Sequence, residues 1–124
     1  MLKLLAVGTG GFIGAMLRYL VSGWVQRLAP QSDFPFGTLT VNIVGCLIIG
    51  LLGGLNYSRE IFSPQARLVI FIGILGSFTT FSTFGYETVA MLRDGQFIPA
   101  TINIATQIII GLLAVIAGYS AAAV

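Results

Sequence analysis

The stretch Gly73-Ile74-Leu75-Gly76-Ser77-Phe78-Thr79-Thr80-Phe81-Ser82-Thr83-Phe84-Gly85 lies within residues 68–86, a segment that carries no charge. An apolar segment of about 20 residues is long enough to span a membrane as a helix. Glycine, serine and threonine are poor formers of a continuous helix. Irregular backbone inside a membrane is tolerated only where protein buries it or where it lines a cavity. The stretch therefore predicts a membrane helix that is broken near residues 76–79.

The composition of the whole chain also indicates a membrane protein. Of the 124 residues, 56% are hydrophobic and 8% are charged, and the mean hydropathy is +0.98. A soluble domain is about a quarter charged, and a disordered chain combines low hydrophobicity with high charge. A single cysteine and the absence of histidine exclude a disulfide framework and argue against zinc. The few basic residues are spread along the chain, so no nucleic-acid partner is expected.

The charged residues separate four long apolar segments. Helices are expected at about residues 3–28, 36–57, 65–94 and 97–123, in a single domain that covers residues 1–124. A membrane β-barrel would show short segments of alternating apolar and polar residues, whereas residues 43–52 are continuously apolar. The predicted fold is therefore an all-α integral membrane protein with four transmembrane helices. Ser63 followed by Pro64 is typical of a helix start, and Gly95 is typical of a helix end.

The distribution of basic residues leaves the membrane orientation open. Four spans place both termini on one side, together with Lys3, Arg59 and Arg67, and leave Arg27 and Arg93 on the other. An excess of basic residues normally marks the cytoplasmic side. Three against two is almost no excess. Either this weak bias still sets one orientation, or the chain inserts in both orientations and pairs with an antiparallel copy.

Glycines inside the spans indicate close packing between helices. Gly10 and Gly14 form one GxxxG pair, and Gly50 and Gly54 form another. Small residues at this spacing let two helix backbones approach closely in lipid. Four short helices enclose little space for a pathway, so a homodimer is expected on grounds of size.

Several polar side chains lie where lipid-facing residues would be expected. Arg18 lies inside the first span, where it either reaches the interface or attracts anions, and we favour the second reading. Asn42 lies in the second span. Its amide either forms a hydrogen bond between helices or donates a hydrogen bond to an anion. Asn103, Thr106 and Gln107 follow at i, i+3 and i+4 on one face of the fourth span. Such a polar stripe is typical of a pathway wall or of contacts that join helices.

Three motifs of this chain resemble the Fluc (CrcB) family of fluoride channels, in order and across its whole length. They are Gly11–Tyr19, Gly37–Asn42, and Gly76 followed by Thr79–Phe84. The resemblance implies an antiparallel, dual-topology homodimer with two fluoride pores, which exports fluoride passively across the bacterial inner membrane. It implies no enzymatic activity and no soluble protein partner. It also implies a structural sodium ion at the dimer centre, held by backbone carbonyls of Gly76 and Thr79 from both subunits.

The resemblance also assigns roles to side chains. The pore phenylalanines map to Phe81 and Phe84, and the pore asparagine maps to Asn42. The glutamate at the pore mouth maps to Glu87, and the vestibule arginine maps to Arg18. The polar track is expected to continue through Ser82, Thr83, Asn103, Thr106 and Gln107. The chain departs from the family at Ser77, where members often have a second glycine.

Two other functions are compatible with part of the sequence. A small multidrug transporter also has four short helices and dual topology, but it needs a membrane-embedded glutamate in its first span. Here that span carries Arg18, which suits an anion pathway better than a cation exchanger. A non-transporting subunit of a membrane assembly would explain the glycines, but it would not explain the run of phenylalanine and hydroxyl residues.

Overall fold

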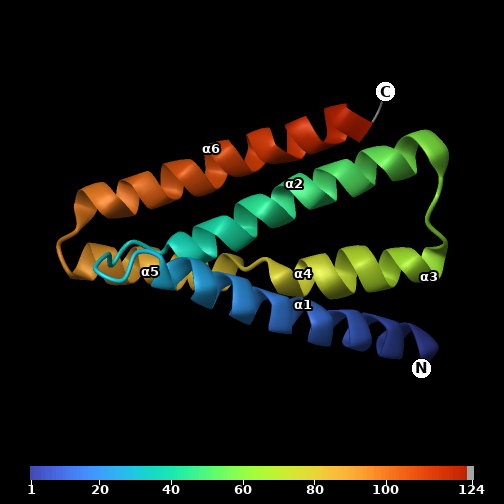
Figure 1. Ribbon diagram of the computed structural model, residues 1–124, viewed down its shortest axis with the longest axis horizontal. Coiled ribbons are helices and arrows are strands. Elements are labelled where there is room, and N and C mark those ends of the chain that lie inside the picture. Colours follow the sequence, from blue (N-terminus) through green and yellow to red (C-terminus); the bar gives the residue numbers. More distant parts are fainter. Residues whose placement is uncertain (123–124) are drawn as a thin grey trace.

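The structure is a computed structural model that describes residues 1–122, and the regular structure in this range is helical (Figure 1). The elements are α1 (Leu2–Arg27), α2 (Phe36–Arg59), α3 (Pro64–Arg67), the π-helix η1 (Leu68–Leu75), α4 (Gly76–Phe78), α5 (Phe81–Arg93) and α6 (Phe97–Ala122). Within residues 1–122, four helical units are long and apolar enough to cross a membrane: Leu2–Arg27, Phe36–Arg59, Pro64–Arg93 and Phe97–Ala122. The predicted all-α membrane fold is therefore confirmed. The expected end of the fourth span, at residue 123, lies outside the described residues.

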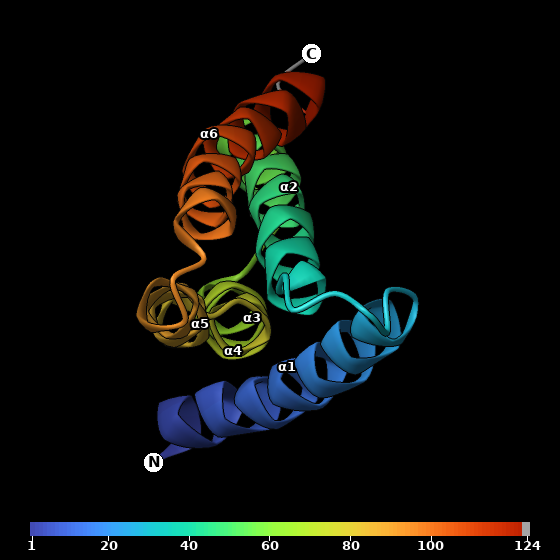
Figure 2. The same cartoon turned by 90° about the vertical axis from the view of Figure 1, so that its left-hand side faces the viewer.

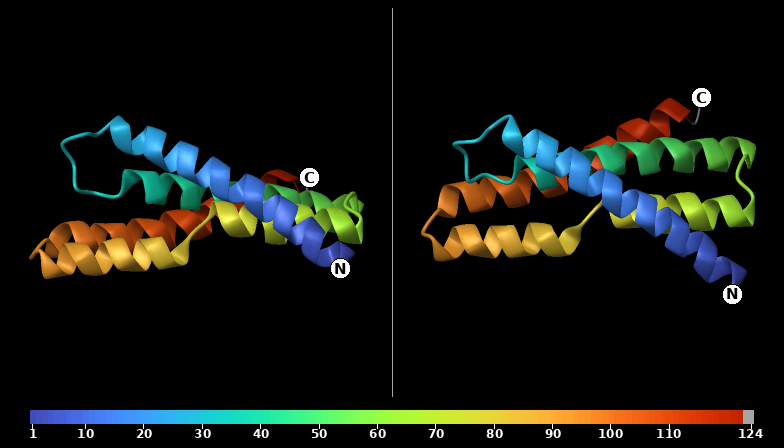
Figure 3. Two further views of the ribbon diagram at one scale, coloured as in Figure 1. Left: turned by 90° about the horizontal axis from the view of Figure 1, so that it is seen from below. Right: turned by 60° about the horizontal axis from the view of Figure 1, so that its bottom comes forward.

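The third span is broken in its middle, as the sequence predicts. Thr79 and Thr80 have extended backbone, with φ and ψ of −88° and 159° at Thr79 and of −152° and 115° at Thr80. Figure 3 shows this extended connection between two helical halves. The details differ from the expectation, because Gly76 and Ser77 remain helical in α4. The break falls at the two β-branched threonines instead of at the small residues.

The third span lies between α1 on one side and the pair α2 and α6 on the other (Figure 2). Close approach between these helices depends on glycine. A Cβ atom added at Gly10 or Gly14 of α1 would overlap a backbone carbonyl oxygen of η1, and one added at Gly50 of α2 would overlap the Val115 carbonyl oxygen of α6. Both GxxxG faces are thus used between helices of one chain.

The start of α1 and the end of α6 lie at the same end of the bundle, where α2 also connects to α3 (Figure 1). The other two connections lie at the opposite end. Lys3, Arg59 and Arg67 are therefore near one end of the bundle, and Arg27 and Arg93 are near the other. This arrangement matches the topology expected for four spans.

Local hydrogen bonds define the ends of several helices. The Ser63 side chain accepts a hydrogen bond from the Ala66 N–H at the start of α3, as expected for an N-cap. Gly95 has a φ of +74° after the end of α5, a conformation that favours glycine. Near the end of α1, the Gln26 amide donates to the carbonyl oxygens of Ser32 and Phe34 in the following loop. Its Oε1 accepts from the Gly37 N–H of α2. These contacts fix the entry into α2.

Candidate ion pathway

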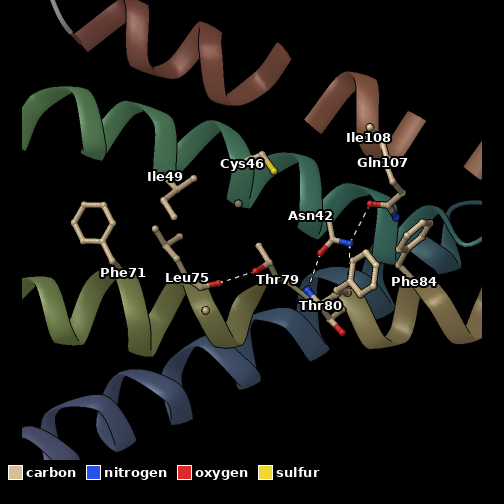
Figure 4. Close-up of a pocket in the computed structure, with 13 residues that line it drawn as sticks. Asn42, Cys46, Ile49, Phe71, Leu75, Thr79, Thr80, Phe84, Gln107 and Ile108 are labelled. Atoms are coloured by element: carbon tan, nitrogen blue, oxygen red, sulfur yellow. Dashed lines mark hydrogen bonds between the residues drawn. The ribbon is translucent and has the colours of Figure 1, made fainter. Parts of the chain in front are cut away.

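The break in the third span is held by Asn42, a side chain from α2. The Thr80 N–H donates to Asn42 Oδ1 over 2.8 Å, and Asn42 Nδ2 donates to the Thr80 carbonyl oxygen over 3.0 Å (Figure 4). In a continuous α-helix the Thr80 N–H would bond to the Gly76 carbonyl oxygen four residues earlier. Asn42 therefore replaces one helical hydrogen bond and releases the Gly76 carbonyl from it.

A cavity of about 350 Å³ lies beside the break. It brings together six of the residues that the sequence singles out, from three of the four spans: Asn42, Gly76, Thr79, Phe81, Phe84 and Gln107. The Phe81 and Phe84 rings meet edge to face, with centroids 5.4 Å apart. Phe81 is 82% exposed in the single chain, whereas Phe84 is buried. The edge of an aromatic ring is electropositive, so such rings can contact an anion.

Gln107 from α6 joins Asn42 at this cavity. Asn42 Nδ2 donates its second hydrogen to Gln107 Oε1 over 3.0 Å. Both hydrogens of the Asn42 amide are therefore used, one by Thr80 and one by Gln107. Gln107 Nε2 is buried and has no hydrogen-bond partner among residues 1–122. A buried donor without a partner is rare in folded proteins.

A second cavity, of about 200 Å³, lies between α1 and the other side of the break. It is lined by Arg18 together with five residues that carry hydroxyl groups, Tyr19, Ser22, Thr38, Thr80 and Thr83. The Thr80 hydroxyl donates to Thr83 Oγ1 over 2.9 Å and accepts from the Thr83 N–H, so it also caps the start of α5. Ser82 is exposed, and its hydroxyl lies 3.4 Å from that of Thr80. One cation and a group of hydroxyl donors can attract an anion to this side of the break.

Two further polar side chains, Glu87 and Asn103, lie between α5 and its neighbours. Glu87 Oε1 accepts from the Thr38 hydroxyl over 2.8 Å, and Asn103 Nδ2 donates to the Thr88 hydroxyl over 3.0 Å. Asn103 is fully buried. Glu87 Oε2 and Asn103 Oδ1 are also buried, without hydrogen-bond partners in the described part of the chain. Together with Gln107 Nε2 they form a set of buried polar atoms whose hydrogen bonding is incomplete.

The polar stripe expected on the fourth span is divided by the structure. Asn103 and Gln107 face other helices of the bundle. Thr106 lines a separate cavity beside residues 31–39, and its hydroxyl donates to backbone carbonyls of its own helix. Sequence reasoning did not single out Thr38, Thr80 or Thr88. Thr38 and Thr80 lie within the motifs quoted above, and Thr88 directly follows Glu87. This proximity to predicted site residues is the one sequence feature that points to them.

A side-chain metal site is not found in the described residues, where no group of three or more His, Cys, Asp and Glu side chains could hold an ion. Backbone carbonyls are a different kind of donor. The Gly76 carbonyl is released by the Asn42–Thr80 contact, and Gly76 is exposed beside Thr79 at the first cavity. Carbonyl oxygens suit hard cations, so these two residues fit a backbone-coordinated ion.

Residues 5–119 match a family model described as "CrcB-like protein, Camphor Resistance (CrcB)". A "Fluoride-specific ion channel FluC" from Sulfurovum sp. (strain NBC37-1) is 48% identical over 115 residues, which cover 93% of this chain and 89% of that protein. "Fluoride-specific ion channel FluC 3" from Methanosarcina barkeri is 43% identical over 98% of this chain and 91% of its own length. A similarly named protein from Geobacter sulfurreducens is 42% identical over 98% of both chains.

Proposed function

The chain belongs to the CrcB family of fluoride ion channels, and from this premise we propose that it conducts fluoride passively out of the bacterial cytoplasm. It is a multi-pass membrane protein and not an enzyme. The observation that carries the proposal is the cavity beside the broken third span. There the amides of Asn42 and Gln107 lie with the Phe81 and Phe84 rings.

The chemistry of this cavity suits a small anion. Fluoride holds its hydration water strongly, so a pore must replace that water with other hydrogen-bond donors. Amide N–H and hydroxyl groups supply such donors, and the ring edges of Phe81 and Phe84 supply positive electrostatic potential. A narrow path lined in this way excludes larger halides by its size, its donor field or both.

The proposed route uses the polar groups on both sides of the break. Arg18 attracts the anion to the cavity that contains Thr83. The route then follows the hydroxyl and amide donors of the bundle towards Glu87, whose carboxylate already accepts from Thr38. The remaining members of the proposed pore are Asn42, Phe81, Ser82, Phe84, Asn103 and Gln107. Thr106 lines a different cavity and is not assigned to this route.

We propose that two copies pair in antiparallel orientation in the inner membrane and form two pores. The near-equal basic residues at the two ends of the bundle permit both insertions. Polar residues of the cavity lie midway along the spans, near an 82% exposed Phe81. Polar groups at this depth need protein or water beside them instead of lipid. A second copy would supply that cover.

A structural sodium ion at the dimer centre is part of the same proposal. The carbonyl oxygens of Gly76 and Thr79 from both copies would hold it. Support comes from the extended backbone at Thr79 and from the contact that releases the Gly76 carbonyl. When bound, the ion would supply a positive charge that attracts carbonyl oxygens from the broken third spans of both copies.

Fluoride efflux from liposomes that contain the purified protein tests the function. A fluoride electrode should record release when a potassium ionophore balances the charge, without ATP or an imposed proton gradient. A small multidrug transporter would instead exchange protons for cationic compounds and retain the fluoride. A non-transporting assembly subunit would leave both solutes inside the liposomes, and either outcome would overturn the proposal.

A further inference from the structure

One cavity of the described chain lies outside the proposed ion pathway. It has a volume of about 660 Å³ and is lined by the connection before α2, the start of α2 and the start of α6. These segments lie at the same end of the bundle (Figure 1). Thr106, which the proposed pathway does not use, also lines it. We call this space the interfacial cavity.

Most polar side chains of the interfacial cavity lie outside the two helices. α2 begins at Phe36 and α6 begins at Phe97. The polar residues that line the cavity from the preceding connections are Gln31, Ser32, Asp33 and Gln96. Connections at the ends of membrane helices lie at the level of the lipid headgroups. Among the ten lining residues that the structure describes, Asp33 is the only charged one. This end of the cavity therefore offers one acidic group and two amides that can donate hydrogen bonds.

The other end of the interfacial cavity is mostly apolar and follows the two helices into the membrane. Its lining residues are Phe34, Phe36, Leu39, Pro99, Ile102 and Thr106. Pro99 and Thr106 are seven residues apart on α6, which corresponds to a depth of about 10 Å. The Thr106 hydroxyl donates to backbone carbonyls of its own helix, so it needs no polar partner in the cavity. This end suits a hydrocarbon chain.

Local contacts hold the connection that borders the interfacial cavity. The Gln26 amide donates to the carbonyl oxygens of Ser32 and Phe34. The Ser32 hydroxyl oxygen accepts from the Phe34 N–H over 3.2 Å. The Phe34 and Phe36 rings pack with their centroids 4.8 Å apart. The cavity is therefore formed before a ligand binds, which lowers the entropic cost of binding.

We propose that the interfacial cavity binds one zwitterionic phospholipid with a primary ammonium headgroup, phosphatidylethanolamine. The ammonium group pairs with the Asp33 carboxylate. Phosphate oxygens accept hydrogen bonds from the Gln31 and Gln96 amides, and an acyl chain lies along Ile102. An anionic headgroup would bring a second negative charge towards Asp33, and a quaternary ammonium has no N–H to donate. This inference goes beyond the proposed function and does not depend on it.

Native mass spectrometry of the purified full chain tests the choice of headgroup. Phospholipids with identical acyl chains and ethanolamine, choline or glycerol headgroups are added separately. The ethanolamine lipid should be retained in excess over the other two, at up to one lipid per chain. Equal retention of the three lipids by the unchanged protein would mean non-specific binding and would overturn the proposal.

A charge substitution tests the role of Asp33 in the same experiment. Asp33→Asn should lower the excess of ethanolamine lipid about threefold, because an exposed charge pair is lost. Asp94→Asn is the matched control, since Asp94 is an exposed acid at the same end of the bundle and does not line the cavity. An equal excess in both variants would overturn the proposed headgroup contact.

A larger side chain tests the path of the acyl chain. Ile102→Trp should fill the apolar end of the cavity and remove most retention of the ethanolamine lipid. Ile98→Trp is the control, because Ile98 is 74% exposed on the same helix and does not line the cavity. Full retention in Ile102→Trp would overturn the proposed binding position.

A crosslinking measurement on the unchanged sequence does not depend on the folding of any variant. The protein is placed in liposomes with an ethanolamine lipid that carries a photoreactive diazirine in its acyl chain, and the labelled peptides are identified. Label should concentrate in residues 31–39 and 96–106, and a choline lipid with the same diazirine should label them less. Even labelling along the exposed surfaces of α1 and α6 would overturn the proposal. So would the absence of label from both segments, because a second copy of the chain would then cover the cavity.

Discussion

Replacing Asn103 with leucine should remove fluoride efflux without weakening the fold. Asn103 is fully buried on α6, where Nδ2 donates to the Thr88 hydroxyl and Oδ1 has no partner among residues 1–122. Leucine has the same number of side-chain heavy atoms and the same branching, but it is larger and has no polar atom. The substitution therefore separates the polar function of this position from its contribution to packing.

The stability change follows from two costs and one gain. The lost hydrogen bond to Thr88 costs about 0.6 kcal/mol, the average for such bonds in a membrane protein. Thr88 retains its own bond to the Phe84 carbonyl oxygen, so no donor is left unpaired there. Removing a buried acceptor that has no partner should raise the free energy of unfolding by about 1–3 kcal/mol. Fitting the larger leucine side chain offsets much of this gain, so the free energy of unfolding of Asn103→Leu should stay within about 1 kcal/mol of that of the unchanged protein.

Two assays on the same preparation test this prediction. The free energy of unfolding is measured by SDS titration followed by circular dichroism, and fluoride efflux is measured from liposomes with an electrode. Thr101→Val is the matched control, because the Thr101 hydroxyl is exposed on α6 and donates to the Phe97 carbonyl of its own helix. The control should keep full efflux.

The opposite pattern would refute the reasoning. If Asn103→Leu lost more than about 1 kcal/mol of stability and still released fluoride normally, Asn103 would be a structural contact between α5 and α6. Its unpaired oxygen would then have no part in the ion pathway.

Other substitutions and ions give further tests. Phe81→Ile and Asn42→Ala should each abolish fluoride efflux while the dimer stays intact by size-exclusion chromatography, and normal efflux in both would remove these residues from the pore. Gly14→Val should lower the free energy of unfolding by about 3 kcal/mol in SDS titration, because the added side chain overlaps a backbone carbonyl of η1; an unchanged value would contradict the observed packing. Gln26→Met should lower the free energy of unfolding by about 2 kcal/mol in the same assay, because three hydrogen bonds of Gln26 hold the loop and the start of α2 to α1. An unchanged free energy of unfolding would mean that these bonds do not stabilise the fold. Efflux and dimer stability should also be lower in potassium-only buffer than in sodium buffer, and equal values would argue against the sodium site.

The sequence predicts the four spans correctly because charge is so unevenly placed along it. Uncharged stretches of sufficient length, such as residues 68–86, determine where helices can cross a membrane. The cap at Ser63 and the end at Gly95 are local features, so sequence reasoning also identified them. These predictions depend on neighbours along the chain and not on the tertiary arrangement.

The position of the break is less predictable because it depends on a residue from another helix. Helix propensity points to Gly76 and Ser77, which remain helical. The Asn42 amide instead pairs with the Thr80 peptide, and this contact joins residues 38 positions apart. No local pattern around the third span shows that partner.

Periodicity likewise identifies a polar face but not its neighbours. Asn103, Thr106 and Gln107 fit one helical stripe, yet Thr106 bonds to its own backbone and lines another cavity. Thr88 was missed because a lone threonine in a helix usually bonds to its own backbone. Its hydroxyl becomes informative only when Asn103 is seen to donate to it.

Electrical recording of the purified protein in a planar bilayer tests the central claim of passive fluoride conduction most directly. With unequal fluoride concentrations on the two sides and equal chloride and pH, the current should reverse at the equilibrium potential of fluoride. It should stay there when a chloride or proton gradient is added. A reversal potential that follows either added gradient, or no current at all, would contradict the claim.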